Sequence, residues 1–535
     1  MKRYTVNFGI ISKNGRVGGK MKLSRLLEDY PFTIDEGEDL LDLEITSVTN
    51  DSRKIEQGGL FVAIKGYLMD GHDYIGKASE KGAAAAVVSE FRKDVKIPQI
   101  RVENPREALS RLSAKLLGYP TKNLKVIGIT ATNGKTTTSY MLDHIYLEAG
   151  YKTGLIGSVM IKSGDEFVHS ELTTPESSDL QKIFLKMAED QVEKAVMEVS
   201  SSALELYRVN DVDFDIVAFN NFSREHIDQH GSLEKYYEAK SSLIRKAKSS
   251  AVAVLNMDDE NTISMKEHTK ARVITFSTKD PSATLFCKNL DLSSGRGRFT
   301  LVVQEGFEGL NGWVPQGEYP VSLKVPGFHS VVNALSAMAI AMADGVDAKV
   351  CVKAMETFGG VERRFQYIYD GDFIIIDDHF ANTSNIDMTL ESLVKLEYEK
   401  LHLVYAIRGN RGPVVNRENL ETLLKWKEKL HMDEIIGTKS VEFVTDKDRV
   451  TKEEIRTYES MLEHSGLEVH LYEELRPAIA YAIDKAQKGD VILLAGSQGM
   501  DYGARIALEY IYRKGIEEDR ESLFSVLRDR VSDMS

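Results

Sequence analysis

The sequence is poor in the residues that build covalently braced or membrane-embedded scaffolds. Its 535 residues include two cysteines, Cys287 and Cys351, which lie far apart in the chain. Two separated cysteines give neither a disulfide framework nor a CxxC metal site, so we interpret both as small buried apolar residues. A run of 18 apolar residues is also missing, so we expect no membrane-spanning helix.

An excess of basic residues is missing as well. The chain has 68 Lys and Arg against 82 Asp and Glu, a net charge of −14 at pH 7, which argues against a nucleic-acid-binding protein. Residues 1–20 carry five basic residues and no acidic one, but they lack the apolar segment of a signal peptide. We therefore predict a flexible N-terminal extension and a cytoplasmic protein, and we expect a monomer.

The length and the apolar pattern indicate several α/β domains. A chain of 535 residues is too long for one hydrophobic core and suggests about three domains. In the middle of the chain, short apolar runs alternate with helix-like stretches, which predicts a mostly parallel sheet with helices on both faces. These runs cover residues 195–199, 214–219, 251–255 and 273–276.

The most informative stretch joins one such strand, residues 124–129, to a helix that opens near Thr136. The connecting loop carries Gly134, Lys135 and Thr136, the end of a phosphate-binding loop. Amide groups at a helix N-terminus favour an anion, the lysine can reach phosphate oxygens, and the threonine hydroxyl can bind Mg²⁺. The usual spacing would place glycine at position 129, where isoleucine stands. The residues alone leave a tight strand-to-helix turn as the alternative.

The string TATNGKTT at residues 130–137 closely resembles the TGTNGKTT phosphate loop of the Mur ligase family, with Ala131 in place of glycine. Members of that family are ATP-dependent ligases that form amide bonds in cell-wall precursors. The resemblance implies that this loop binds ATP, through Asn133, Gly134, Lys135, Thr136 and Thr137.

The stretch before the loop resembles the uridine-nucleotide domain of the MurE type. It contains the string DSR at residues 51–53 and FVAIKG at 61–66, followed by DGHDYI at 70–75. By itself this pattern indicates a small α/β domain. The resemblance implies that Ser52 and His72 contact the UDP-linked substrate, whereas a loop histidine bonded to its own backbone is the simpler interpretation of His72.

A carboxylate ends the apolar strand at residues 196–199, beside the phosphate loop. Glu198 has apolar neighbours, and a hard oxygen ligand at a strand end suits Mg²⁺. The string EVSSSAL at residues 198–204, with Arg208 beyond it, resembles EVSSHAL…R of the MurE type, with Ser202 replacing histidine. The resemblance implies Glu198 as a metal ligand, and Thr173, Thr174, Ser200 and Arg208 as substrate-binding residues.

A polar loop and a helix complete the expected centre. The string NNFSREHIDQHG at residues 220–231, with Lys240 beyond it, resembles TNLSRDHLDYHG…AK of the family. The resemblance implies that His226 binds a second Mg²⁺ and that Lys240 is carbamylated and faces the metals. It thus implies four catalytic residues: Lys135, Glu198, His226 and Lys240. A solvated helical lysine is the alternative for Lys240. Asn256 and Asn333 match family positions near ATP.

The resemblance weakens after residue 337. Arg364 stands where the family has the arginine of PGRME, and Asp378 where it has a nucleotide-contacting acid, so both are implied ATP contacts. The histidine expected after Asp378, the DNPR box that marks diaminopimelate selection and the AGKGHE string are absent or changed. The resemblance therefore does not predict which amino acid this chain adds.

We therefore predict an α/β protein of three domains that uses ATP and two Mg²⁺ ions. The expected partners are a UDP-linked sugar-peptide and a free amino acid, joined through an acyl phosphate. The archaeal pseudomurein ligases are one alternative within the family. A bacterial enzyme that adds something other than diaminopimelate is another. Folylpolyglutamate or cyanophycin ligases, and a catalytically degenerate ATP-binding partner subunit, are the remaining alternatives. The predicted domains are a uridine-nucleotide domain within residues 1–121, a doubly wound P-loop domain at 122–358, and a Rossmann-like domain at 359–535.

Overall fold

The computed structural model describes residues 19–35, 38–66, 69–223, 230–293, 295–380 and 382–527, together with Arg530 and Ser532. The chain forms two compact units. The first contains the described residues up to 286 with 302–317 and 335–351, and the second contains 287–301, 318–334 and the described residues from 352 onward. The second unit therefore includes three stretches that we predicted within the central domain: 287–301, 318–334 and 352–358.

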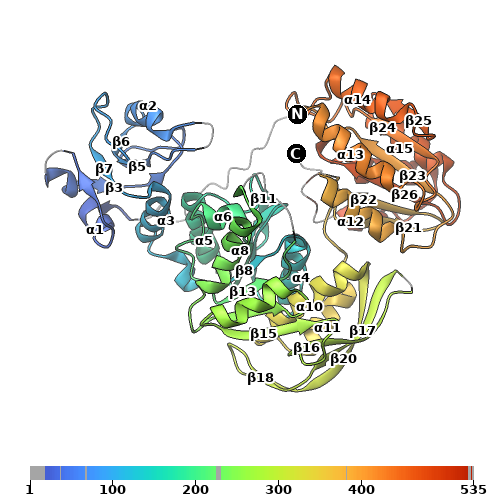
Figure 1. Ribbon diagram of the computed structural model, residues 1–535, viewed down its shortest axis with the longest axis horizontal. Coiled ribbons are helices and arrows are strands. Elements are labelled where there is room, and N and C mark those ends of the chain that lie inside the picture. Colours follow the sequence, from blue (N-terminus) through green and yellow to red (C-terminus); the bar gives the residue numbers. More distant parts are fainter. Residues whose placement is uncertain are drawn as a thin grey trace. The chain divides into compact units, whose positions relative to one another are not determined.

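The first sheet has the strand order β2-β7-β6-β5-β4 and is parallel except for β2. Helix α3 starts at a proline, and the Asn104 side chain caps it by accepting the amide hydrogens of Arg106 and Glu107. Its apolar side packs on one face of the sheet, and α2 packs on the other (Figure 1). The elements are β1 Met21–Lys22, α1 Leu23–Leu27, β2 Thr33–Ile34, β3 Glu44–Ile45, β4 Val48–Thr49, β5 Gly59–Val62, α2 Ile75–Glu80, β6 Ala83–Val88, β7 Gln99–Arg101 and α3 Pro105–Leu116.

The largest sheet has the order β11-β10-β9-β12-β8-β13-β14-β15-β16-β17-β20. Its strands run parallel from β9 to β16, as the alternating pattern predicted. The antiparallel strands β10 and β11 extend it at one edge. The elements up to β14 are β8 Lys125–Thr130, α4 Lys135–Glu148, β9 Thr153–Ile156, β10 Met160–Ser163, β11 Glu166–His169, α5 Ser177–Glu189, β12 Lys194–Glu198, α6 Ser201–Glu205, β13 Ile216–Phe219, α8 Leu233–Arg245 and β14 Val252–Asn256.

The remaining elements of this part of the chain include a small hairpin, β18 with β19. They are α9 Glu260–Ile263, β15 Arg272–Ser277, β16 Leu285–Asp291, β17 Arg296–Val303, β18 Phe307–Glu308, β19 Trp313–Val314, β20 Gly317–Pro326, α10 Phe328–Ala343 and α11 Ala348–Thr357.

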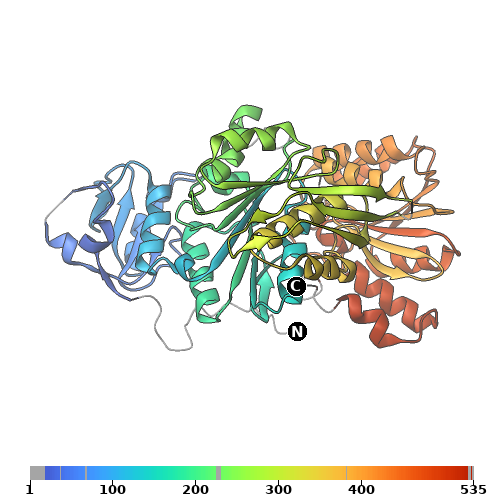
Figure 2. The same cartoon turned by 90° about the horizontal axis from the view of Figure 1, so that it is seen from below.

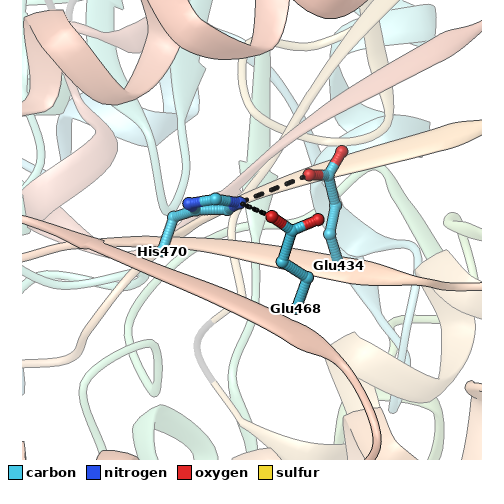
Figure 3. Close-up of side chains that lie close together, drawn as sticks. All are labelled: Glu434, Glu468 and His470. Carbon is cyan, nitrogen blue, oxygen red and sulfur yellow. Dashed lines mark ion pairs between the residues drawn. The ribbon is translucent and has the colours of Figure 1, made fainter.

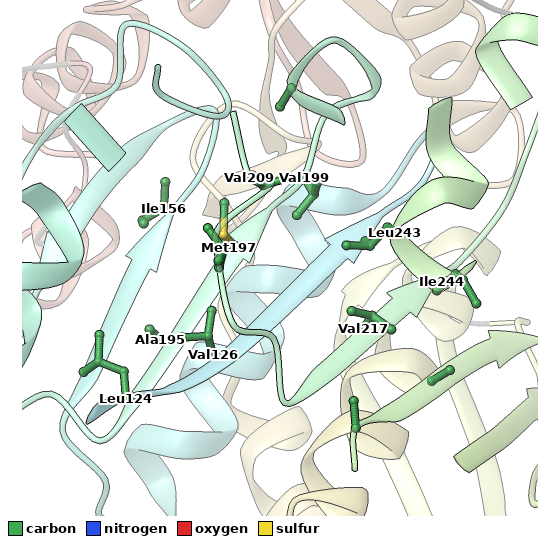
Figure 4. Close-up of a cluster of buried hydrophobic side chains, with 14 of the residues drawn as sticks. Leu124, Val126, Ile156, Ala195, Met197, Val199, Val209, Val217, Leu243 and Ile244 are labelled. Carbon is green, nitrogen blue, oxygen red and sulfur yellow. The ribbon is translucent and has the colours of Figure 1, made fainter. Parts of the chain in front are cut away.

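Side-chain alternation decides where Glu198 points. Ala195 and Met197 of β12, and Val199 directly after it, belong to the apolar core beneath α5, α6 and α8 (Figure 4). Successive side chains of a strand point to opposite faces. Glu198 therefore points to the other face, toward the amino end of α4.

The C-terminal sheet has the order β21-β22-β26-β23-β24-β25, with every neighbouring pair parallel except β21 with β22. Helices α12, α13 and α14 pack on one face, and α15, α16 and α17 on the other (Figures 1 and 2). This agrees with the predicted Rossmann-like domain. The elements are β21 Gln366–Asp370, β22 Ile374–Asp378, α12 Thr383–Leu393, β23 Leu401–Ala406, α13 Pro413–Trp426, β24 Glu434–Thr438, α14 Lys452–Leu462, β25 Glu468–Tyr472, α15 Leu475–Lys485, β26 Val491–Gly496, α16 Gly503–Lys514 and α17 Arg520–Phe524.

Among the described helices, none is both long enough and apolar enough to cross a membrane. The two cysteines are buried, as expected.

An ion-pair network lies at the amino end of the C-terminal sheet. Glu434, Glu468 and His470 place carboxylate and imidazole atoms within 4.8 Å of one another (Figure 3). The Lys485 ammonium lies 2.6 Å from a Glu434 oxygen, and His402 Nδ1 lies 2.7 Å from the other oxygen. Lys485 already supplies a cation, so we interpret the group as a stabilising network. It lies at the edge opposite to that where parallel sheets bind ligands.

Glu434 should make the stability of the second unit depend on pH. Burial raises the pKa of Glu434, but the hydrogen bonds from His402 and Lys485 outweigh it and lower the pKa to about 2. Because this folded-state pKa lies below the ordinary value, the ionised group stabilises the fold above about pH 4.5, and that stabilisation is lost as the pH falls toward 2. We expect Glu434→Gln to lower the unfolding free energy by roughly 3 kcal/mol at pH 7, because it breaks a buried pair, and by less at pH 3.

Urea denaturation at both pH values measures this difference. Glu468→Gln is the matched control, since its side chain is 63% exposed and its loss should cost less than about 1 kcal/mol. Equal effects of the two substitutions at pH 7 would contradict the interpretation.

Candidate active site

The phosphate loop lies between β8 and α4, as predicted. Gly134 caps α4 with a φ of 85°, a left-handed conformation that glycine adopts without strain. The carbonyl of Ala131 accepts hydrogen bonds from two lysines, at 2.8 Å from Lys135 Nζ and 2.6 Å from Lys240 Nζ. Two ammonium groups and the amino end of a helix thus converge on this loop, which makes it attractive to an anion.

The loop that follows β13 holds the phosphate loop in place. Asn221 donates its side-chain amide to the Asn133 carbonyl at 2.8 Å and accepts the Asn133 amide hydrogen at 3.0 Å. The Thr132 amide donates to the Asn221 carbonyl, and the Ser223 amide donates to the Thr132 hydroxyl, both at 3.0 Å. Because these bonds fix the loop backbone on both sides of Asn133, the loop is preorganised.

Glu198 is fully buried and lies beside the start of α4. The Thr136 hydroxyl donates to its Oε2 at 2.9 Å. The Ser158 amide donates to Oε1 at 2.8 Å, and the Ser158 hydroxyl donates to Oε2 at 3.1 Å. A hydroxyl and a carboxylate held together at a phosphate loop form the hard oxygen donor set that Mg²⁺ prefers. The predicted metal ligands Thr136 and Glu198 therefore do lie together.

The predicted substrate-binding residues of the central domain gather around the same strand end. Thr173 shares a hydrogen bond of 3.0 Å with the Ser158 hydroxyl. Thr174 donates its hydroxyl to the Glu198 carbonyl at 2.9 Å and accepts the Ser200 amide hydrogen at 3.1 Å. Arg208 donates to the Thr174 carbonyl at 3.1 Å and pairs with Glu176 at 2.6 Å.

Lys240 lies in the interior, which excludes the solvated-lysine alternative. Its side chain projects from α8 and is 1% exposed, with Nζ 4.9 Å from the centre of the Tyr236 ring. A buried lysine that reaches a phosphate loop is a candidate for function, because burying its charge costs free energy.

Asn256 and Thr138 are connected to the loop through Asn220. The Asn256 side chain donates to the Asn220 carbonyl at 2.8 Å, and the Asn220 side chain donates to the Thr138 hydroxyl at 3.0 Å. Asn256 also accepts the Asp258 amide hydrogen at 3.0 Å. The Asn256 side chain therefore joins the carboxyl ends of β13 and β14. Its contact with ATP stays a prediction.

Ser52 and His72 lie with the first sheet. His72 is 3% exposed; its Nδ1 lies 2.6 Å from Asp70 Oδ1, and its Nε2 accepts the Ser89 amide hydrogen at 3.1 Å. Both ring nitrogens are thus engaged within the domain. This favours the simpler interpretation, a histidine that shapes its own loop, and a contact of either residue with substrate stays a prediction.

Three predicted ATP contacts belong to the second unit. Asn333 lies in α10 and is 6% exposed. Asp378 accepts the Phe365 amide hydrogen at 2.6 Å and the Thr389 hydroxyl at 2.8 Å. Burial raises the pKa of Asp378 to about 6, although Thr389 and the Arg364 charge act in the opposite direction. The positive charge of Arg364 thus acts to lower the pKa of Asp378. His226, the remaining predicted residue, lies outside the described residues.

Sequence reasoning missed the residues that hold the site together. Gly157 and Ser158 follow β9 and carry neither a charge nor a recognisable spacing. Asn221 follows β13 and lies within the string at residues 220–231, but the resemblance assigned it no role. Only their position could have pointed to these residues, because small and polar residues directly after parallel strands lie at the edge of the sheet that binds ligands.

Comparisons with known proteins agree with this geometry. Three family models match: the Mur ligase family catalytic domain over residues 44–116, the Mur ligase middle domain over 129–341, and the Mur ligase glutamate ligase domain over 363–498. The UDP-N-acetylmuramoyl-L-alanyl-D-glutamate–2,6-diaminopimelate ligase of Bacillus velezensis is 36% identical over 483 residues, 89% of this chain and 94% of that protein.

Solved structures show the same fold. A UDP-N-acetylmuramoyl-L-alanyl-D-glutamate–2,6-diaminopimelate ligase superposes with a TM-score of 0.63 at 23% identity, covering 90% of this chain and 94% of that one. MurF from Acinetobacter baumannii superposes with a TM-score of 0.60 at 21% identity, covering 92% and 99%.

The phosphate loop, the acidic strand end and the three-part α/β architecture define the chain as an ATP-dependent ligase. It belongs to the Mur ligase family, and its sequence relatives are of the MurE type.

Gly157 offers a test of the Glu198 position. A Cβ atom on Gly157 would lie 2.3 Å from Glu198 Oε1, so Gly157→Ala must displace the carboxylate or the strand. If the carboxylate acts at the ligase centre, turnover should fall by about a hundredfold or more. Gly76→Ala is the matched control, because open space surrounds that helical position. Wild-type turnover in Gly157→Ala would contradict the role of Glu198.

Proposed function

We propose that this ligase joins a free amino acid to a UDP-linked muramyl peptide, with ATP cleaved to ADP and phosphate. The observation that carries the proposal is the buried Glu198 carboxylate, which accepts the Thr136 hydroxyl at the start of α4. Thr174 bonds the Glu198 backbone carbonyl, Arg208 bonds Thr174, and Thr173 bonds Ser158 beside the carboxylate. The sequence relatives, whose names specify a UDP-N-acetylmuramoyl dipeptide acceptor, support the choice of acceptor.

The reaction proceeds in two displacements. A carboxylate oxygen of the acceptor attacks the γ-phosphorus of ATP, ADP leaves, and an acyl phosphate forms. The amine of the amino acid then attacks the acyl carbon, phosphate leaves with that carboxylate oxygen, and the amine loses a proton as the amide forms.

Lys135 and the amides of α4 stabilise the charge on the transferring phosphoryl group. To do so, Lys135 exchanges its hydrogen bonds to the Ala131 and Thr132 carbonyls, at 2.8 and 3.0 Å, for phosphate oxygens. The preorganised loop needs no other rearrangement, because Asn221 already fixes its backbone.

Thr136 and Glu198 would hold Mg²⁺, and His226 with a carbamylated Lys240 would hold a second ion. Mg²⁺ held there would neutralise part of the charge on the phosphate oxygens. The donor set fits, because hydroxyl and carboxylate oxygens are its preferred ligands and Glu198 already accepts the Thr136 hydroxyl. Because Ser158 bonds the buried Glu198 carboxylate, Glu198 and Thr136 would stay in place between turnovers.

Release of phosphate from ATP tests the function. The assay supplies UDP-N-acetylmuramoyl-L-alanyl-D-glutamate as acceptor, with diaminopimelate and the standard amino acids as donors of the amine. The proposal predicts release that requires both the acceptor and one amino acid. If the protein binds ATP but releases no phosphate with any of these amino acids, the result would favour a partner subunit without ligase activity.

Replacing Lys135 should abolish turnover while the fold persists. Lys135→Ala removes an ammonium group aimed at the phosphates, so we expect a loss of about a hundredfold or more in kcat. Phosphate release measures it, and thermal denaturation checks the fold. Lys122→Ala, at an exposed lysine before β8, is the control. An undiminished rate in Lys135→Ala would remove the phosphate-loop assignment.

Replacing Lys240 tests the carbamate. Lys240→Ala should cripple turnover, and bicarbonate or a short carboxylic acid should restore part of it by supplying the missing anionic oxygens. The exposed Lys235 on the same helix gives the control variant, Lys235→Ala. Normal turnover in Lys240→Ala would exclude the carbamate, and mass spectrometry of the intact wild-type protein provides an independent check.

A further inference from the structure

The last described residues of the chain are buried against the start of the C-terminal sheet. Arg530 is 3% exposed and donates to Asp377 at 2.6 Å and to the side chain of Gln366 at 2.7 Å. Asp377 and Gln366 are paired residues of β22 and β21. The two planar donor groups of one arginine therefore join two strands, a geometry that a lysine cannot reproduce.

A second contact joins this terminal segment to the turn before β21. The Ser532 amide and hydroxyl both donate to Glu362 Oε2, at 3.3 and 3.2 Å, and Arg530 Nε lies 3.7 Å from the same oxygen. Glu362 is 8% exposed, and Asp377 is fully buried. Breaking such a buried charge pair is costly, because it leaves a carboxylate desolvated without its partner.

The turn that these contacts surround is strained. Arg363 and Phe365 have φ angles of 55° and 51°, left-handed values that non-glycine residues adopt only when their surroundings impose them. Arg363 lies 3.6 Å from Asp377 and also contacts Asp501 and the Gly496 carbonyl. Asp377, which Arg530 binds, is thus one of the groups that impose this conformation.

Arg364 lies between the two strained residues, and Asp378 follows Asp377. The Phe365 amide donates to Asp378, so the turn and the strand end are locked to each other. Arg364 and Asp378 are two of the three residues of this unit that we propose to contact ATP, and the third, Asn333, lies in α10. Arg530 and Ser532 therefore bind Glu362 and Gln366, each two positions from Arg364, and Arg530 also binds Asp377, next to Asp378.

We propose that Arg530 is a positioning residue for nucleotide binding, which holds Arg364 and Asp378 in place through Asp377 and Gln366. This inference rests on the proposed function, because it assumes that Arg364 and Asp378 contact ATP. Arg530 would then contribute to nucleotide binding without contacting the nucleotide itself.

Substituting Arg530 separates this role from a purely structural one. In Arg530→Met we expect the KM for ATP to rise about tenfold, while kcat and the KM for the acceptor change by less than about threefold. A fluorescent ATP analogue, titrated in the absence of acceptor, should bind about tenfold more weakly. Loss of folded protein alone would lower kcat and leave both KM values unchanged.

Three further variants sharpen the test. Arg513→Met, at an exposed arginine near the end of α16, should behave as wild type. Arg530→Lys keeps the charge without the planar fork, so its nucleotide affinity should fall between wild type and Arg530→Met. In an Arg364→Met background, Arg530→Met should weaken nucleotide binding little further, because residues that act through one another are non-additive.

Different results would contradict the positioning role of Arg530 and the proposed ligase function. Wild-type nucleotide affinity in Arg530→Met, with wild-type protein binding the analogue normally, would overturn the role of Arg530 and leave the proposed function intact. Additive losses in Arg530→Met and Arg364→Met would also overturn it. If wild-type protein bound no nucleotide, both hypotheses would fall.

Discussion

The candidate centre depends on one buried carboxylate. Glu198 ends a strand in the middle of a parallel sheet, where it is fully buried and an uncompensated charge would be costly. The fold compensates it with donors from two elements: the Thr136 hydroxyl at the amino end of α4, and the Ser158 amide and hydroxyl after β9. Gly157 leaves the space that this arrangement needs. The carboxylate, the phosphate loop and the loop after β9 are therefore fixed together.

The sheet topology explains why these groups meet. Strand β8 lies between β12 and β13, all parallel, so the loops that follow the three strands emerge at one edge. The loop after β8 carries Lys135, the end of β12 carries Glu198, and the loop after β13 carries Asn221. In the C-terminal sheet, the ion-pair network around Glu434 lies at the amino end of the strands, whereas Asp378 lies at the carboxyl end. One edge is thus available for ligands while the other stabilises the fold.

Much of the fold and part of the site could be predicted from the sequence. The strands that were predicted from apolar runs lie within a few residues of β12, β13, β14 and β15, because buried parallel strands need continuous apolar side chains. Lys135, Thr136 and Glu198 could be found because their chemistry depends on residue type and on a local spacing. Small-residue contacts such as Gly157 beside Glu198 could not, since they depend on distances between elements. Likewise, no local pattern shows that residues 287–301 and 318–334 pack with the second unit. The bonds from Arg530 to Asp377 span more than 150 residues and leave no local pattern.

Transfer of oxygen from the acceptor to phosphate tests whether this ligase forms an acyl phosphate. The acceptor is prepared with ¹⁸O in its reacting carboxylate and incubated with ATP, Mg²⁺ and the amino acid that supports turnover, and the released phosphate is analysed by mass spectrometry. A ligase that proceeds through an acyl phosphate must deliver one labelled oxygen to each phosphate that it releases. Unlabelled phosphate would mean that ATP is hydrolysed by water and would contradict the account.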